Sequence, residues 1–134
     1  VMKKTFTLGK TERLKSRKAI EELFEKGKSF SISPIRLIYQ RTAMEELQAG
    51  VGVSSKNFKK AVDRNRIKRR IREAYRLQKM PLQQLMQSRG KGVRIFLTYT
   101  GKEMPEYAAL SAAVGKCLNK LLKQLNKMSQ DDGS

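Results

Sequence analysis

The sequence contains no histidine, no tryptophan and a single cysteine, Cys117, among its 134 residues. Without histidine there is no imidazole to act as a general base, and Cys117 has no histidine partner that could activate it as a nucleophile. A lone cysteine excludes a disulfide within the chain. Together with the absence of histidine it also excludes the usual thiolate and imidazole zinc sites, and it fits a reducing cytoplasm. The sequence therefore lacks the residues of the usual nucleophilic triads and dyads.

Acidic residues are also scarce, with 12 Asp and Glu against 30 Lys and Arg and a net charge of +18. The pairs Glu21-Glu22 and Glu45-Glu46 are adjacent in sequence and so point apart, whereas a two-metal nuclease needs carboxylates that converge on ions about 3.5–4 Å apart. A phosphate-cradling GxxxxGK loop is missing as well. We therefore expect a protein that binds a polyanion and does not itself break phosphodiester bonds.

Long apolar runs are absent: none approaches the ~20 residues that span a bilayer, and the N-terminus has no signal-peptide core. We expect a cytoplasmic protein with no membrane partner. The chain length suits a single domain with one core. We expect a basic, irregular arm over residues 1–15, anchored only by Phe6, Leu8 and Leu14, a folded domain over 16–128 and a frayed tail over 129–134.

The first half of the domain should contain one helix and two strands. Ser16 can cap a helix over residues 17–26 that Gly27 ends. Residues 35–40 and 49–54 follow an extended pattern on either side of a polar connection, which predicts an antiparallel hairpin. Gly50 and Gly52, in the second of these strands, should allow close approach by a neighbouring backbone or a ligand.

The second half should contain a central strand and a long helix. Residues 93–99 are β-branched and aromatic, which predicts the central strand, and the helix before Pro81 should end there, with a short extra turn after it. The long helix should open at Pro105 or Glu106 and bury one stripe, which comprises Leu110, Val114, Cys117, Leu118, Leu121 and Leu125. Its outward lysines could contact phosphate, although lysines in such places more often only aid solubility.

The most informative stretch is residues 59–76, KKAVDRNRIKRRIREAYR. Ile67, Ile71, Ala74 and Tyr75 recur at helical spacing, so one narrow apolar stripe can be buried while the remaining surface is almost entirely cationic. Like charges one turn apart cost about a few tenths of a kcal/mol per pair, which an external anion would offset. A polyanion is therefore the expected partner of this face, and a merely solvated basic face is the alternative.

The block Val51-Gly52-Val53-Ser54-Ser55-Lys56, followed by AVDRNRIKRRIRE over residues 61–73, closely resembles the protein subunits of bacterial ribonuclease P. That family's RNR signature is intact as Arg64-Asn65-Arg66, and the segment ending LFEKG at Gly27 is similar to the family's first helix. The tripeptide alone would be weak evidence. The extended block, its position in mid-chain and the order of elements before it make the resemblance specific, and it covers roughly residues 12–125.

The resemblance implies an α+β fold, described as an α/β sandwich in which a small mixed four-stranded sheet is flanked by three helices. It also implies a left-handed βαβ crossover around the basic helix, against the general right-handed expectation. The family's protein joins a catalytic RNA, and together they remove the 5′ leader from precursor tRNA by phosphodiester hydrolysis. The RNA carries the active site and binds most of the Mg²⁺, so we expect a protein that is non-catalytic alone and monomeric apart from the RNA.

The resemblance also implies two sets of site residues. The set that should bind the catalytic RNA comprises Lys56, Lys60, Arg64, Asn65, Arg66, Lys68, Arg69, Arg70 and Arg72. The set that should line a cleft for the single-stranded leader comprises Ile20, Phe24 and, allowing for a one-residue insertion, Tyr39. Ile20 stands where the family often has an aromatic ring, and residues 57–59 replace a Lys-x-Gly type of turn. No catalytic or metal-binding residue is expected on the protein.

Two other functions remain open at this point. A ribosomal or general RNA-structuring protein would bind unrelated RNAs with comparable affinity and show no preference for a tRNA that carries a leader. A protein-only nuclease would cleave without any RNA subunit, and the missing catalytic residues argue against it.

Overall fold

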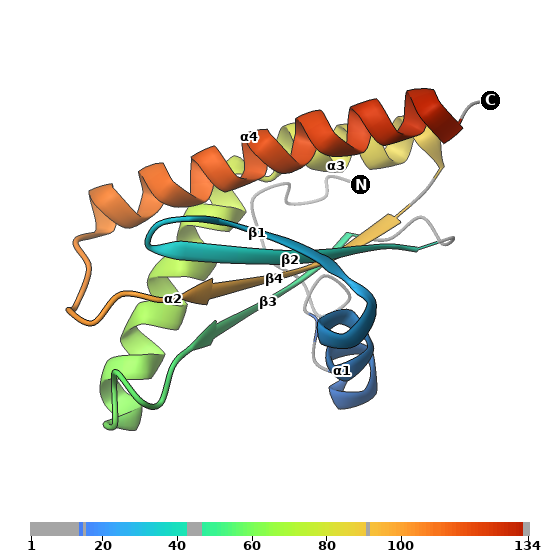
Figure 1. Cartoon of the computed structure of the whole chain (residues 1–134). Helices are drawn as coiled ribbons and strands as arrows, with labels where there is room; N and C mark the ends of the chain where they lie inside the picture. Colours follow the sequence, from blue (N-terminus) through green and yellow to red (C-terminus); the bar gives the residue numbers. More distant parts are fainter. Residues whose placement is uncertain (1–13, 15, 43–46, 91, 133–134) are drawn as a thin grey trace, which may run out of the picture.

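The computed structural model describes the backbone of residues 14, 16–42, 47–90 and 92–132, with side chains as far as Asn126. Four helices and one four-stranded mixed sheet form an α+β fold, as predicted (Figure 1). Of the predicted N-terminal arm only Leu14 is among the described residues. The elements in chain order are α1 (Arg17–Lys26), β1 (Lys28–Ile32), β2 (Ile35–Thr42), β3 (Leu47–Val53), α2 (Ala61–Gln78), α3 (Met80–Arg89), β4 (Gly92–Tyr99) and α4 (Tyr107–Asp132).

The strands are ordered β1-β2-β4-β3, so β4 is central, as predicted. Strand β4 runs antiparallel to β2 and parallel to β3, and it lies between them. The predicted hairpin between residues 35–40 and 49–54 is therefore wrong. The hairpin partner of β2 is β1, which it joins through the two-residue turn Ser33-Pro34. Strand β1 has no buried residue and carries two serines, so its sequence pattern is too weak to predict it.

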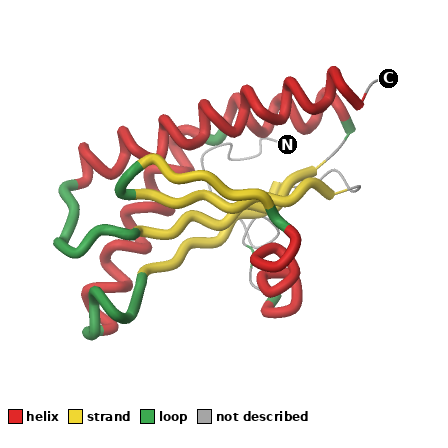
Figure 2. The backbone as a smooth tube through the Cα atoms, in the orientation of Figure 1, coloured by secondary structure: helices red, strands yellow, loops and turns green. Residues whose placement is uncertain are grey.

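The two faces of the sheet are covered by different helices, and α4 and α1 lie on opposite sides of it (Figure 2). Because side chains alternate along a strand, Leu37, Ile95 and Leu97 point toward α2 and α4 and are fully buried there. The α2 stripe joins the same core: Ile67, Ile71, Ala74 and Tyr75 are buried, as predicted. On the other face, α1 packs through a small cluster formed by Leu14, Leu23 and Ile38.

Helix α1 has the bounds that its caps predict. The Ser16 hydroxyl accepts a hydrogen bond from the Ala19 N–H at 3.3 Å, and the Gly27 N–H donates to the Leu23 carbonyl at 2.7 Å. A Cβ at Gly27 would lie 2.4 Å from that carbonyl oxygen, so the helix end has no room for a side chain. Leu14 holds the start of the domain to the edge strand, because its N–H donates to the Ala49 carbonyl at 3.0 Å.

The connection from β3 to β4 contains two helices. Helix α2 ends at Gln78, before Pro81 as predicted, and the expected short turn is the ten-residue helix α3, which Gly90 ends with φ of 64°. The described part of the chain therefore has four helices where the resemblance implies three. Because β3 and β4 are parallel neighbours, this connection is a crossover; its left-handedness stays a prediction.

Helix α4 begins at Tyr107, next to the predicted start, and its six predicted stripe residues are all buried. The helix continues to Asp132 and so enters the segment for which a frayed tail is predicted. None of the helices in the described residues is both long and apolar enough to cross a membrane.

Candidate nucleic-acid interface

The basic side of α2 faces away from the core. Asn65, Arg66 and Arg69 are exposed on the helix, and Lys56 and Lys60 are exposed in the segment that leads into it. Arg66 and Arg69 form no ion pair with any residue that the structure describes. Their guanidinium groups therefore remain available for anions, for which their planar forks give bidentate contacts to phosphate.

Two arginines of the predicted set also form hydrogen bonds to backbone carbonyls and so stabilise the segments beside α2. Arg64 donates through one Nη to the carbonyls of Phe58 and Lys59, both at 2.8 Å, and so fixes the segment that enters α2. Arg70 donates to the Pro105 carbonyl at 2.6 Å and ties α2 to the segment that precedes α4. Both side chains are half-buried, and neither is neutralised by these carbonyls, so the surface keeps their charge.

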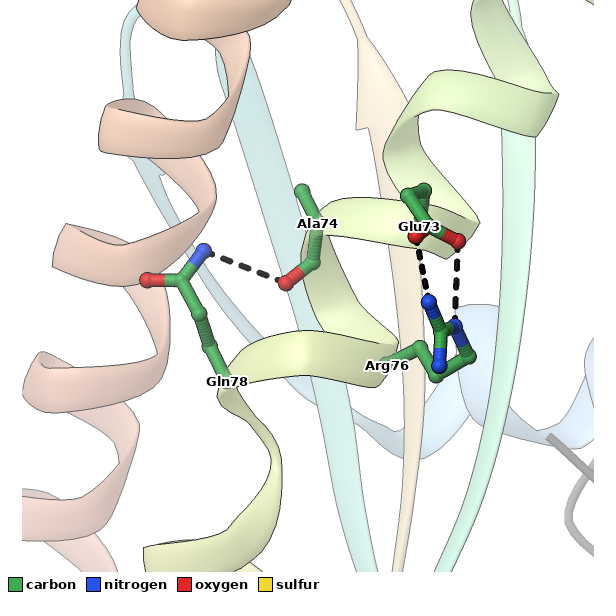
Figure 3. Close-up of polar contacts among 4 residues, drawn as sticks. All are labelled: Glu73, Ala74, Arg76 and Gln78. Carbon is green, nitrogen blue, oxygen red and sulfur yellow. Dashed lines mark hydrogen bonds and ion pairs between the residues drawn. The ribbon is translucent and has the colours of Figure 1, made fainter. Parts of the chain in front are cut away.

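Near the C-terminal end of the basic side, Glu73 and Arg76 pair with each other (Figure 3). The Arg76 Nε donates to Glu73 Oε2 at 3.0 Å, and a second Arg76 nitrogen contacts Oε1. The hydrogen bond and the charge of Arg76 lower the pKa of Glu73, which keeps its carboxylate ionised. The opposite charges of this pair largely cancel, so the basic side of α2 ends here. Arg76 is not in the predicted RNA-binding set.

Gln78 helps to fix the orientation of α2 against α4. Its Nε2 donates to the Ala74 carbonyl at 3.1 Å and to the Ser111 carbonyl of α4 at 3.0 Å. Figure 3 shows Gln78 pointing toward α4, with Glu73 and Arg76 on the other side of the helix. A Cβ at Gly115 would lie 2.4 Å from Gln78 Oε1, so the glycine makes room for this contact. The role of Gln78 cannot be recognised from the sequence, because its partner Ser111 belongs to an element far along the chain.

A cleft of about 320 Å³ opens between α1, β3, β4 and α2 on the face of the sheet that α1 covers. Ile20, one of the residues predicted to line a cleft, lies in its wall. Arg72, from the predicted RNA-binding set, also lines it, so one residue of α2 belongs both to the basic side of the helix and to the wall of the cleft. The lining residues are Leu14, Ile20, Ala49, Gly50, Val51, Arg72 and Phe96.

Phe24 lies next to this cleft, with half of its surface exposed (50%). Its ring meets the ring of Phe96 edge to face, with the centroids 5.2 Å apart and the planes at 67°. Phe96 is a cleft residue that the sequence analysis missed, because it is embedded in a continuous apolar strand that is typical of a core. The signal that could have identified it is Gly50-x-Gly52 in the neighbouring strand, where missing side chains leave space for a ring.

Tyr39 does not line the cleft, which corrects the prediction that grouped it with Ile20 and Phe24. It is buried on the opposite face of the sheet, where its hydroxyl donates to Gln124 Oε1 of α4 at 2.8 Å. Burial raises the pKa of Tyr39, as expected for a phenol in a core. The neighbouring residue Ile38 is the β2 residue that packs with α1. Because a shift of one residue along a strand moves a side chain to the other face, the one-residue insertion allowed in the prediction led to the wrong face.

Among residues 14, 16–42, 47–90 and 92–126, no three His, Cys, Asp or Glu side chains lie close enough together to hold a metal ion. Cys117 is buried in the core, and burial raises its pKa to about 11, so the thiol is protonated at neutral pH. The surface around α2 and the cleft offers cationic donors and apolar walls, which suit binding of a nucleic acid.

The family model described as Ribonuclease P matches residues 8–124. The ribonuclease P protein component of Porphyromonas gingivalis is 38% identical over 119 residues, which cover 85% of each chain. That of Chlorobium phaeobacteroides is 32% identical over 128 residues, which cover 86% of this chain and 88% of the relative.

Solved structures show the same fold. The RNase P protein from Thermotoga maritima matches with a TM-score of 0.67 at 24% identity, over 81% of this chain and 96% of that one. The Staphylococcus aureus RNase P protein matches with a TM-score of 0.57 at 20% identity, over 85% and 97%. With the family match and the curated relatives, the chain belongs to the ribonuclease P protein family.

Proposed function

We propose that this RNA-binding subunit of ribonuclease P presents the basic side of α2 to the catalytic RNA and its cleft to the 5′ leader of precursor tRNA. The observation that carries the proposal is that the exposed cations of α2 continue through Arg72 into the cleft. The proposed contacts to the catalytic RNA are Lys56, Lys60, Arg64, Asn65, Arg66, Lys68, Arg69, Arg70 and Arg72.

In this arrangement the protein contributes charge and a groove. Arg66 and Arg69 would hold phosphates of the catalytic RNA, and Asn65 can donate to or accept from a 2′-hydroxyl beside them. Arg72 lines the cleft, so a leader bound there would lie next to the catalytic RNA. The protein's charge of +18 lowers the repulsion between the two RNAs.

The chemical step belongs to the RNA in this proposal. The catalytic RNA would bind most of the Mg²⁺ that supports hydrolysis, and the protein would lower the Mg²⁺ concentration that assembly requires, since both neutralise phosphate. The holoenzyme would act on precursor tRNA in the cytoplasm, with one protein bound as a monomer.

Reconstitution tests the proposal. The protein, mixed with a bacterial ribonuclease P RNA at a Mg²⁺ concentration too low for the RNA alone, should restore cleavage of precursor tRNA. The RNA alone and the protein alone are the controls, and cleavage by the protein alone would indicate a protein-only nuclease. Absence of rescue would count heavily against the proposal.

A second measurement separates this role from that of a general RNA-structuring protein. The reconstituted holoenzyme should bind precursor tRNA more tightly than mature tRNA, because only the precursor carries a leader for the cleft. Equal affinity for the two, and for unrelated RNAs, would favour the general RNA-binding role.

A further inference from the structure

A second group of cations lies at the β1 edge of the sheet, where α1 ends and β1 begins (Figure 1). A pocket of about 110 Å³ opens there, and we call it the β1–β2 pocket. Its lining residues are Lys26, Lys28, Tyr39, Gln40 and Arg41. The cleft lies toward the β3 edge of the same sheet, and no described residue lines both.

The strand register explains why the cations of this pocket meet. Lys28 pairs with Tyr39, so Arg41, two residues further along β2, lies diagonally opposite Lys28 on the same face. Lys26 comes from the last turn of α1, which Gly27 joins to β1. A Cβ at Gly27 would lie 2.9 Å from the Tyr39 carbonyl oxygen, so the missing side chain lets the end of α1 approach β2.

Acidic side chains do not balance this group of cations. Within the described ranges, the Glu22 carboxylate lies 3.9 Å from Lys26 Nζ and 3.6 Å from an Arg94 Nη, so one acid is shared by two cations. Lys28 is exposed and forms no ion pair with a described residue. Like charges on neighbouring strands destabilise a sheet, and an external anion would remove this cost.

The size of the pocket suits a phosphate group. Liquid water takes ~30 Å³ per molecule, so the pocket has the volume of a few waters. It is much smaller than the ~300–1,000 Å³ of pockets that enclose drug-sized molecules, and so it is too small for a nucleobase with its sugar. Ammonium and guanidinium groups at its rim supply the charge-assisted donors that phosphate oxygens accept.

Lysines of α4 extend the same basic surface. Lys120 Nζ lies 4.8 Å from the centroid of the Phe30 ring in β1. One turn later, Gln124 accepts the hydrogen bond from the Tyr39 hydroxyl, and so this part of α4 contacts a wall of the pocket. Lys123, beside Gln124, is exposed. The cations therefore continue from the pocket onto α4, which gives room for more than one phosphate.

We propose that the β1–β2 pocket binds one backbone phosphate of an RNA strand, and that Lys120 and Lys123 bind phosphates next to it. This site is separate from the basic side of α2 and from the cleft, so the subunit contacts RNA at both edges of its sheet. Contacts to phosphate carry no sequence information, so the site accepts any sequence. The strand belongs to the catalytic RNA or to precursor tRNA, and the experiment distinguishes these two sources.

The first measurement uses inorganic phosphate as the probe, added to the full chain at constant ionic strength and followed by NMR. The backbone amide signals of Lys28 and Arg41 should shift along a saturable curve, which is resolved from the signals of Arg66 and Arg69 on α2. Lys28→Ala should weaken phosphate binding at this pocket about 2- to 5-fold, the effect of one exposed ion pair, and Lys28→Arg should preserve it. Lys102→Ala removes an exposed lysine beyond the opposite end of β4 and should leave this binding unchanged.

The second measurement identifies the RNA. The salt dependence of affinity is compared for the protein with catalytic RNA and for the holoenzyme with precursor tRNA. Lys28→Glu reverses one charge of the pocket, so it should flatten the log–log slope by about 0.7–0.9 for the RNA whose phosphate is bound there. Lys102→Glu is the matched control and should change neither slope. Circular dichroism checks that each variant is folded.

The outcomes separate the pocket from the proposed function. Phosphate shifts at Lys28 and Arg41 that do not saturate, or that Lys28→Ala leaves unaltered, would overturn the site. Saturable phosphate binding with both RNA slopes unchanged would overturn the assignment to RNA. The preference of the holoenzyme for precursor over mature tRNA is measured independently, so the proposed function can stand when this inference fails.

Discussion

On one face of the sheet Leu37, Ile95 and Leu97 are completely buried under α2 and α4, whereas on the other face Phe96 is only half-buried beside two glycines. The first face forms the main core of the domain. The second has a small cluster under α1 and a cleft of about 320 Å³ next to it. The difference indicates that this protein takes its stability mainly from one face and keeps part of the other available for a ligand.

Helix α2 belongs to both regions. Ile71 is completely buried in the main core, while the next residue, Arg72, is exposed and lines the cleft. Because neighbouring residues on a helix point about 100° apart, a single turn can serve the core and the ligand surface together. A substitution on the buried side of α2 should therefore reduce stability, whereas a substitution at a neighbouring exposed position should mainly reduce binding.

The largest effect should come from Ile71→Asp, which places a carboxylate in the core stripe. An unpaired buried charge costs more than ~4 kcal/mol, a large part of the ~5–15 kcal/mol that stabilises a typical domain. We expect an unfolded or severely destabilised protein by circular dichroism. Val62→Asp adds the same charge on the same helix where the side chain is 66% exposed, and it should remain folded. Similar stability of the two variants would contradict the division of α2 into two sides.

The next prediction compares how much the two faces of the sheet contribute to the free energy of unfolding. Leu97→Ala removes a completely buried side chain from the main core and should cost about 2–5 kcal/mol of unfolding free energy. Ile20→Ala, in the half-buried wall of the cleft, should cost less than about 1.5 kcal/mol, because part of its surface is already exposed to water. Urea denaturation measures both values. Equal losses would show that the two faces contribute equally to stability.

A smaller effect should separate arginines that bind RNA from one that also supports the fold. If ~6–8 phosphates are engaged, the logarithm of affinity should fall with log salt at a slope of roughly −4 to −7. Arg66→Ala or Arg69→Ala should flatten that slope by about one with little change in stability. Arg64→Ala should also cost about 1–3 kcal/mol of stability, since it loses both hydrogen bonds to the Phe58 and Lys59 carbonyls. An unchanged slope would remove the substituted residue from the interface.

The smallest effect concerns Cys117 in the main core. Burial raises its pKa from 9.0 to about 11, so the folded state favours the protonated thiol. The stability from this shift is fully present below pH 9.0 and is lost as the pH rises through about 11. Between pH 8 and pH 10 the unsubstituted protein should lose about 1 kcal/mol more unfolding free energy than Cys117→Ala, measured by urea denaturation at each pH. An equal loss in the two proteins would show that the thiol is not shielded.

Several features of this protein follow from the local sequence. The caps at Ser16 and Gly27 determine the bounds of α1, and the helical spacing of Ile67, Ile71, Ala74 and Tyr75 determines which side of α2 is buried. These signals depend on residues a few positions apart, so they can be identified without knowledge of the fold. The RNR block identifies the family for a similar reason, since the pattern is contiguous.

The errors have a common cause. The partner of β2 and the face on which Tyr39 lies depend on strand pairing and register. An alternating apolar pattern identifies a strand, but it does not determine which strand lies beside it. The cleft is the clearest example, because its walls come from residues as distant in sequence as Ile20 and Phe96.

The sequence by itself determined the charge, the helix caps, the amphipathic side of α2 and the absence of a histidine-based active site, because each depends on composition or on local spacing. Only the tertiary structure decided that β4 separates β2 from β3, that Tyr39 belongs to the core and that Phe96 belongs to the cleft. The physical reason is that pairing and packing between distant segments are settled by the fit of whole elements, which no short stretch of sequence contains.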